Sequence, residues 1–478
     1  MEKSAMPVYS SLRIRENDAG HIKAWKKRTA EKLLLLRAAL DTHIADASGE
    51  ESAERACERN GRQWLRLATW NIREFDTLKY GGRLKESLYF IAEIISHFDI
   101  VALQEVREDL ACLQSVVQFL GQHEWDYIAT DVTEGSSGNR ERMVFIYQKN
   151  RVRFTSIAGE VMLDKGDLVT DSSGLCFRDA SGLKVEFPEG VTLLPSGDVP
   201  VIKRKGKVLL EDDLVIPLPA GTRIVLPEGS SLVLPGGTQL PVENGQVALD
   251  AASHQAWSPH ALVRPPYDLL SGIGLQFARS PFLVTFQAGW LKFILCTVHI
   301  YYGTGKEGLA RRNEEIRKLT RFLSRRAESE HDSDAENFFF VLGDFNIVGK
   351  KHVTWESLHS NGFRVPEQLQ KIPAGSNAAR DKAYDQIAFW QPTAAGHPGT
   401  TFIDVGNAGI FDYFKYVFRW GDDDHDGEDE RYYAEKTKTH KLAYKEWRTY
   451  QMSDHLPMWI ELRTDFGTDY LSAVSASD

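Results

Sequence analysis

Five segments of the chain share one pattern, in which polar residues that can bind metal or phosphate border a hydrophobic run of β type. Four of them follow the runs LRLAT, DIVAL, FILCTV and FFFVLG, and the fifth precedes LPMWIEL. Side chains at adjacent strand ends converge on one crevice that a stiff scaffold holds. The residues that carry the pattern are Asn71, Glu105, His299, Asp344, Asn346, Asp454 and His455.

This set of side chains suits a hard divalent cation. Carboxylate and amide oxygens without thiolates favour Mg²⁺ or Mn²⁺ over zinc. We expect Glu105 and Asp454 to bind the metal, with Asn71 helping to bind metal or phosphate. The predicted cofactor is therefore Mg²⁺ or Mn²⁺.

The two histidines and the GDFN segment supply what phosphodiester cleavage needs besides metal. That reaction requires an activated water, neutralised charge on the phosphorus oxygens and a stabilised leaving oxygen. His299 and His455 can donate to phosphate oxygens or move protons. Asp344 can orient or deprotonate the water while Asn346 holds phosphate. The sequence therefore predicts metal-dependent phosphodiester hydrolysis.

Each fragment alone has a plainer interpretation. A glutamate at a strand end is usually a solvated turn residue, GDFN could be a capped turn, and a single histidine is more often structural. The occurrence of all five segments in this order favours the catalytic interpretation.

The elements that must position these residues alternate in type from Trp64 onward. Short β-type runs such as LRLATWNI, DIVALQEV and RMVFIYQ are separated by the helical stretches LKESLYFIAEIISHF and LACLQSVVQFLG. The alternation resumes after an interruption, with a helix expected over 307–328. It predicts an α/β domain with its chemistry at strand ends.

Three further regions lie outside this alternation. Residues 1–61 are interpreted as a helical extension and linker, with an amphipathic helix over 18–47 that packs on the main domain. Its expected apolar stripe consists of Ile22, Trp25, Leu33, Leu34, Leu36 and Leu40. The main domain is expected over 62–164 and 256–465, followed by a tail over 466–478.

The interruption at 165–255 repeats a Leu-Pro-x-Gly unit at a period of eight residues, beginning at Leu218, Leu226 and Leu234. Each unit is a short apolar strand and a turn. Stacked units would bury one face, as in a β-roll or solenoid. We therefore expect an inserted β-rich repeat subdomain with a structural or substrate-guiding role.

The run GDDDHDGEDE at 421–430 resembles the first half of a calcium loop. Asp422, Asp424, Asp426 and Gly427 fit D-x-D-x-D-G, but Tyr433 stands where a bidentate glutamate is required. A solvated acidic loop is the favoured interpretation, and Ca²⁺ the weaker alternative.

Composition limits the partners and the compartment. The net charge is −10 and the pI about 5.8, whereas a protein that holds nucleic acid by bulk electrostatics is basic. Four cysteines without C-x-x-C spacing indicate free thiols. An N-terminus without an apolar signal segment, and no apolar stretch of about 18 residues, predict a cytoplasmic protein without a membrane span. Oligomeric state stays open.

The chain resembles the endonuclease/exonuclease/phosphatase superfamily, and within it the deoxyribonuclease I-like branch. The likeness covers about 62–465 without the insertion. Its motifs are WNIREF, DIVALQEVRED, RERMVFIYQKN, FARSPFLVTF, TVHI, VLGDFN, AYDQIAFW and SDHLPMWIEL. The resemblance implies a four-layer α/β sandwich, in which two facing β-sheets are covered by helices.

The resemblance also implies roles that spacing alone does not assign. Glu141 would orient His299, and Asp385 would orient His455, each fixing a tautomer and favouring the protonated form. Arg107 would reach the DNA minor groove, and Arg279 is expected near the phosphate. The groove tyrosine of the branch is replaced by Asn139, so that contact to DNA does not carry over.

Three functions are compatible with these features. The first is a Mg²⁺-dependent endonuclease that cleaves DNA, which the branch-specific motifs favour. The second is a phosphodiesterase or phosphatase on a phospholipid or small phosphoester, which the acidic balance favours. The third, a non-catalytic scaffold, is disfavoured because no motif position has been lost.

Overall fold

The computed structural model describes residues 7–47, 64–78, 80–132, 140–162, 277–332, 337–390 and 403–475, and short strands between 167 and 264. The chain divides into two compact units. The first consists of Met1–Val161, Arg279–Thr304 and Thr320–Asp478, and the second of Met162–Ala278 and Gly305–Leu319.

Sheet A of the first unit has six strands. In spatial order they are β23 (Val405–Ile410), β24 (Met458–Arg463), β1 (Trp64–Phe75), β2 (Ile100–Val106), β4 (Arg142–Gln148) and β3 (Trp125–Ala129). β1 and β2 are parallel, and the other neighbours are antiparallel. The runs predicted from the sequence thus form the centre of this sheet.

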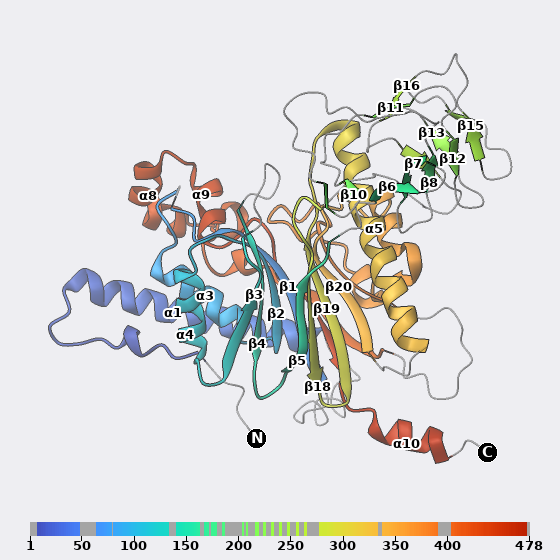
Figure 1. Cartoon of the computed structure of the whole chain (residues 1–478). Coiled ribbons are helices and arrows are strands. Elements are labelled where there is room, and N and C mark those ends of the chain that lie inside the picture. Colours follow the sequence, from blue (N-terminus) through green and yellow to red (C-terminus); the bar gives the residue numbers. More distant parts are fainter. Residues whose placement is uncertain are drawn as a thin grey trace. The chain divides into compact units, whose positions relative to one another are not determined.

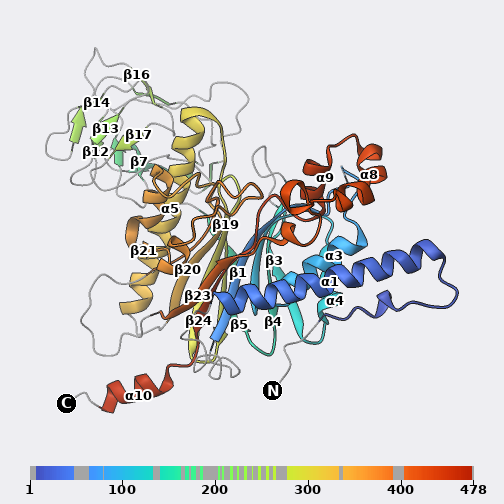
Figure 2. The same cartoon turned by 180° about the vertical axis from the view of Figure 1, so that it is seen from behind.

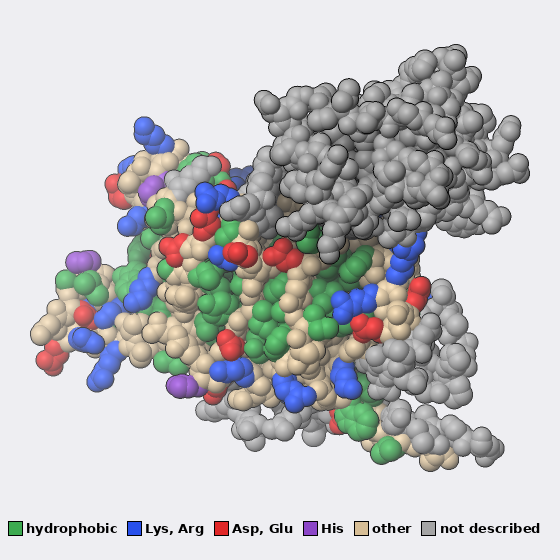
Figure 3. All heavy atoms as spheres, viewed as in Figure 1, with side chains coloured by type: hydrophobic (Ala, Val, Ile, Leu, Met, Phe, Trp, Pro, Cys, Tyr) green, Lys and Arg blue, Asp and Glu red, His purple; other side chains and the backbone are tan. Residues whose placement is uncertain are grey.

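Sheet B of the same unit also has six strands. They are β21 (Phe363–Arg364), β22 (Asp385–Trp390), β20 (Asn337–Asp344), β19 (Leu291–His299), β18 (Phe282–Ala288) and β5 (Arg153–Glu160). Only β19 and β20 are parallel neighbours among them. The edge strand β5 is exposed, and hydrophobic side chains are visible between charged ones on that face (Figure 3).

The two sheets face each other, since β1 and β2 contact β20 and β24 contacts β22. Helices cover the outside of the pair (Figure 1). α1 (Gly20–Asp46), α3 (Lys85–Ile95) and α4 (Ala111–Leu120) share one hydrophobic core with sheet A. The C-terminal part of α5 (Gly305–Asp332) lies beside sheet B in both views (Figure 2), and α6 (Val353–His359) contacts β21. The predicted four-layer sandwich and N-terminal helix are confirmed.

The face that α1 buries differs from the predicted stripe. Its buried residues follow a spacing of three or four and are Lys26, Thr29, Leu33, Leu36, Leu40 and Ile44. Leu34 is 66% exposed and Ile22 37% exposed. Successive helical residues point about 100° apart, so Leu33 and Leu34 cannot both face the core. α1 packs on α3, where Arg37 Nε donates to Glu93 Oε1 at 2.6 Å.

The second unit contains many short strands, as expected for a β-rich insertion. They are β6 (Asp167–Asp171), β7 (Gly174–Arg178), β8 (Lys184–Glu186), β9 (Lys203–Arg204), β10 (Lys207–Val208), β11 (Ile216–Leu218), β12 (Arg223–Val225), β13 (Ser231–Val233), β14 (Gln239–Leu240), β15 (Gln246–Ala248), β16 (Gln255–Trp257) and β17 (Leu262–Arg264). The strands of three successive repeats, β11, β12 and β13, belong to three different sheets and pair antiparallel. The rest of 165–255 and the linker at 48–61 lie outside the described residues.

The segment between β23 and β24 is helical in part. It contains the short helices η3 (Tyr413–Lys415) and η4 (Gly421–Asp423), then α8 (Glu428–His440) and α9 (Tyr444–Gln451). The helices α7 (Glu367–Gln370) and α10 (Gly467–Ser475) also belong to the first unit. No described helix is both long and apolar enough to cross a membrane.

The acidic run at 421–430 is only partly the solvated loop that the sequence predicts. Asp424 and Asp429 are buried. The Asp424 carboxylate accepts from the backbone N–H of Asp429 at 3.1 Å, at the start of α8, and pairs with Arg419 at 3.3 Å. Asp429 binds Arg28 of α1 at 2.7 Å. These carboxylates therefore cap a helix and fasten α1, because buried charges need partners.

Candidate active site

Strand direction brings the expected residues of the two sheets to one rim. β1 and β2 end there because they are parallel, and β24 begins there because it is antiparallel to β1. In sheet B, β19 and β20 end together with His299 opposite Asp344, and β22 begins with Asp385 opposite Asp344. Side chains separated by hundreds of positions in the sequence thus meet at one edge.

Irregular backbone at this rim turns the side chains inward. The pairing of β1 with β2 shifts register after Asn71, and Glu105 has a φ of 63°. Asn346 has a φ of 54°. Left-handed backbone at residues other than glycine is costly and concentrates at functional sites. Beneath Glu105, the Gln104 side chain ties the two sheets together, donating to Thr297 Oγ1 at 2.8 Å.

The Asp344 carboxylate lies at the centre of the site. Its Oδ2 is 3.6 Å from His299 Nε2 and 3.7 Å from His455 Nε2. Asn71 Nδ2 donates to the same oxygen at 3.1 Å, and the Asn346 backbone N–H donates to Oδ1 at 2.8 Å. Two imidazoles and two amides therefore converge on one buried carboxylate.

His299 is held from behind by Glu141. The Nδ1 atom of His299 lies 2.7 Å from Glu141 Oε1, and Arg279 contacts the same carboxylate. Burial and Arg279 act to lower the pKa of His299, but Glu141 and Asp344 outweigh them and raise it above its usual range. A carboxylate at Nδ1 directs Nε2 toward the centre of the site.

His455 is held in the same way by Asp385. Its Nδ1 lies 2.7 Å from Asp385 Oδ2. Burial opposes protonation, but Asp385 and Asp344 raise the pKa of His455 well above its usual range. The Trp70 indole and the Tyr413 hydroxyl both donate to the His455 carbonyl, at 3.0 and 2.8 Å. The backbone of this segment is thus fixed from beneath.

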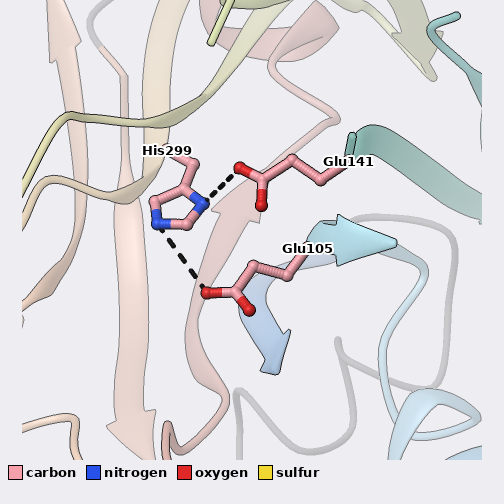
Figure 4. Close-up of side chains that lie close together, drawn as sticks. All are labelled: Glu105, Glu141 and His299. Atoms are coloured by element: carbon pink, nitrogen blue, oxygen red, sulfur yellow. Dashed lines mark ion pairs between the residues drawn. The ribbon is translucent and has the colours of Figure 1, made fainter. Parts of the chain in front are cut away.

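Glu105 faces His299 from the opposite sheet (Figure 4). Its Oε1 lies 3.8 Å from His299 Nε2. Burial acts to raise the pKa of Glu105, but the His299 charge, the Asn71 amide and the Glu74 backbone N–H outweigh it and bring it to about 2. Glu105 is therefore an ionised carboxylate at neutral pH.

Asp454 is the most solvent-accessible acid of the set, with 42% of its side chain exposed and Arg73 at 3.6 Å. Together with Glu105 it offers oxygen ligands of the kind that Mg²⁺ prefers. Glu105, Glu141 and His299, and likewise Asp344, Asp385 and His455, have potential ligand atoms within 4.8 Å of one another. Since Nδ1 of each histidine is 2.7 Å from a carboxylate, these two groups are better explained as carboxylate–histidine pairs than as metal sites. The donor set fits a hard cation at Glu105 and Asp454.

Three expected residues have contacts other than those anticipated. Arg107 lies 3.6 Å from Glu74. Arg279 is buried and contacts Glu141, the carboxylate that holds His299. The Asn346 amide donates to the Ile300 carbonyl at 2.7 Å. Asn139, where the branch has its groove tyrosine, lies outside the described residues.

Sequence reasoning overlooked two residues at the site. Arg73 contacts Asp454 and lies over the Tyr450 ring, with its guanidinium carbon 3.9 Å from the centroid. The ring of Tyr384 lies 5.6 Å from that of His455. Arg73 and Tyr384 stand inside the motifs WNIREF and AYDQIAFW, so the motifs marked their position without indicating their partners.

A cleft of about 770 Å³ opens beside His455 and Asp454. The segment between β23 and β24 supplies most of its wall, including Phe414, Trp420 and Arg448. The candidate site is therefore open to a ligand of substantial size.

No family model and no curated protein match the chain. Solved structures do match. A humanized D. rerio TDP2 is 10% identical, covering 84% of this chain and 99% of that one, with a TM-score of 0.39. The human Nocturnin catalytic domain with bound sulfate is 12% identical over 84% and 94%, with a TM-score of 0.40. An endonuclease/exonuclease/phosphatase family protein from Bacteroides thetaiotaomicron is 13% identical over 84% and 99%, with a TM-score of 0.40. One of these three is thus a named member of the superfamily that the sequence motifs resemble.

Proposed function

We propose that this protein is a divalent-metal-dependent phosphodiester hydrolase that cleaves DNA as an endonuclease. The observation that carries the proposal is the pair of carboxylate-backed histidines, whose Nε2 atoms face one oxygen of Asp344 at 3.6 and 3.7 Å. Glu105, with a pKa of about 2, adds a permanent carboxylate beside them. Such a combination suits a reaction in which negative charge grows on phosphate oxygens.

The surroundings of each residue indicate its role in the proposed reaction. Bound at Glu105 and Asp454, with Asn71 nearby, Mg²⁺ would neutralise phosphate charge and lower the pKa of a water. His299 and His455, with raised pKa values, donate to phosphate oxygens and to the leaving oxygen. Asp344 orients the attacking water and accepts its proton, and Asn346 holds Asp344 through its backbone N–H.

A phosphodiesterase or phosphatase acting on a phospholipid or small phosphoester is the second candidate. The arrangement of Arg107 and Arg279 supports it, because one lies beside Glu74 and the other is buried against Glu141. A DNA backbone needs cations that can reach its phosphates. Substrate, and not reaction type, separates the two candidates.

A substrate panel tests the proposal. The purified protein is incubated with supercoiled plasmid, RNA, bis-p-nitrophenyl phosphate and sphingomyelin, each with Mg²⁺ and with EDTA. We expect plasmid nicking in Mg²⁺ only. Hydrolysis of a lipid or small ester without nicking would replace the first candidate by the second, and inactivity on every substrate in Mg²⁺ and Mn²⁺ would refute both.

A further inference from the structure

The cleft beside His455 contains cations that the reaction does not use. Its lining combines Arg380, Lys445 and Arg448 with the rings of Trp420 and Tyr384 and with the carboxylates of Asp422, Asp423 and Asp454. Lys445 and Arg448 belong to α9, and Trp420 to the stretch before η4. The cleft therefore has features that the catalytic rim alone does not require.

Arg448 is a buried cation without a carboxylate partner in the described part of the chain. It is 6% exposed, and the one hydrogen bond of its side chain there runs from Nη1 to the Phe418 carbonyl at 3.0 Å. Its Nε is buried with no hydrogen-bond partner, and its guanidinium lies 3.9 Å from the Phe414 ring centroid. Burial lowers the pKa of Arg448. Because an unpaired buried charge is costly, this position is suited to receive an anion.

Lys445 reinforces that position from the outer side of the cleft. Its Nζ lies 4.5 Å from the Trp420 ring centroid, and no carboxylate pairs with it among the described residues. Arg380 is different, because it contacts Asp412 and lies 3.4 Å from Asp423. Lys445 and Arg448 are thus the two cleft cations whose charge is not matched by a carboxylate contact.

Planar rings accompany this pair of cations. Trp420 is partly exposed, and its ring centroid is 5.7 Å from the Arg448 guanidinium. Tyr384, also partly exposed, lines the same cleft, and its ring lies 5.6 Å from that of His455. Aromatic faces bind nucleobases by stacking, and cations beside them bind the connecting phosphate.

We propose that the cleft binds an unpaired nucleotide next to the scissile phosphodiester, with its base against Trp420 and Tyr384 and its outer phosphate at Lys445 and Arg448. This subsite rests on the proposed phosphodiesterase function and adds to it a preference for a strand that is unpaired beside the cleavage site. Arg448 is buried and lines the cleft, so a phosphate that contacts it has to enter the cleft, which suits an unpaired strand better than a duplex. The volume of about 770 Å³ leaves room for a nucleotide.

Binding is measured first, apart from catalysis. Fluorescence anisotropy gives the Kd of labelled hexathymidylate for protein carrying His299→Ala, a residue outside the cleft wall. Adding Lys445→Ala is expected to raise Kd about ten-fold and to reduce the slope of log Kd against log salt by about 0.7, since one phosphate contact is lost. Lys436→Ala, an equal loss of charge at an exposed position on α8, is the matched control and is expected to leave both unchanged. Equal Kd values for the Lys445 and Lys436 variants, or equal affinity for a duplex of the same length, would overturn the proposal.

Two further variants separate the base from the phosphate. Trp420→Leu is expected to remove the preference for hexathymidylate over an abasic chain of equal length, while Arg448→Gln weakens both ligands. Because Arg448 is buried, the melting temperature of the Arg448→Gln protein is also measured, to check that the variant is folded. A Trp420→Leu protein that keeps the full preference would rule out stacking.

Measurements of catalysis then distinguish the nucleotide subsite from the proposed phosphodiesterase function on which it rests. Lys445→Ala is expected to reduce kcat/KM about ten-fold more for oligonucleotide than for bis-p-nitrophenyl phosphate, which has no second phosphate. An equal reduction of kcat/KM on both substrates would refute the nucleotide subsite and leave the proposed phosphodiesterase function standing. No hydrolysis of either substrate by the unsubstituted protein would instead refute the proposed function.

Discussion

The two carboxylate–histidine pairs look alike in geometry and differ in charge. In both, Nδ1 lies 2.7 Å from a carboxylate and Nε2 faces Asp344. Behind His299, the Glu141 carboxylate also contacts the Arg279 guanidinium. Behind His455, no Lys or Arg of the described residues contacts the Asp385 carboxylate. Asp385 therefore acts on His455 without a cation in contact with it, whereas Arg279 partly offsets the charge of Glu141 that acts on His299.

This difference in charge gives the two histidines different roles as proton donors. One is expected to stay protonated, and the other to gain and lose its proton. The pKa of His455 is raised well above its usual range, whereas that of His299 is raised with Arg279 acting against the rise. We expect His455 to stay protonated throughout the working pH range and His299 to be the imidazole that exchanges a proton. Nearly identical distances can thus support two different roles.

The largest expected effect comes from deleting either imidazole. His299→Ala and His455→Ala should each lower kcat for Mg²⁺-dependent plasmid nicking by about 10²–10⁴-fold, because a positioned proton donor is lost. Circular dichroism checks that the fold persists. Nicking at the rate of the unsubstituted protein in both variants would contradict the assigned chemistry.

Asp385→Asn should have the next largest effect. It should lower activity and leave stability nearly unchanged. An amide cannot hold His455 as a cation, so kcat is expected to fall by about 10²-fold or more, as for carboxylates that fix a catalytic histidine tautomer. The thermal unfolding midpoint should change little, because no Lys or Arg in the described part of the chain contacts Asp385. A large drop in the midpoint with kcat preserved would mean that Asp385 is structural.

Glu141→Gln should instead affect stability strongly, because it leaves Arg279 buried beside a neutral amide. Removing one partner of a buried ion pair costs about 3–5 kcal/mol in the free energy of unfolding. Urea unfolding measures this loss, and the double variant Glu141→Gln with Arg279→Gln is expected to recover much of it. A double variant no more stable than the single one would show that Arg279 does not depend on Glu141.

The strand-end residues of this site could be predicted from the sequence, and their partners could not. Asn71, Glu105, His299 and Asp344 each follow a short apolar run, so the local pattern marks them. The support by Glu141 and Asp385 came only from the family resemblance, because no local signal joins positions so far apart in the chain.

Long-range packing also explains what the sequence analysis missed. The motif that contains Arg279 does not indicate that this buried arginine contacts Glu141. The acidic run was expected in solvent, yet Asp429 meets Arg28, about 400 positions earlier in the chain. The cleft wall at Trp420 and Arg448 depends on how α9 packs, which periodicity does not indicate.

The smallest expected effect is a shift in the pH profile of kcat, and it tests the difference between the two carboxylate–histidine pairs most directly. Arg279 lowers the pKa of His299, so Arg279→Gln should raise that pKa further. If His299 acts as a protonated donor, the alkaline limb of the kcat profile reports its loss of the proton, and this limb should move to higher pH by up to about one unit. Arg279→Lys keeps the charge and should leave the limb near its original place. A shift to lower pH in Arg279→Gln, or equal shifts in both variants, would mean that the cation behind Glu141 does not set the proton affinity of His299, and the two histidines would then differ in position alone.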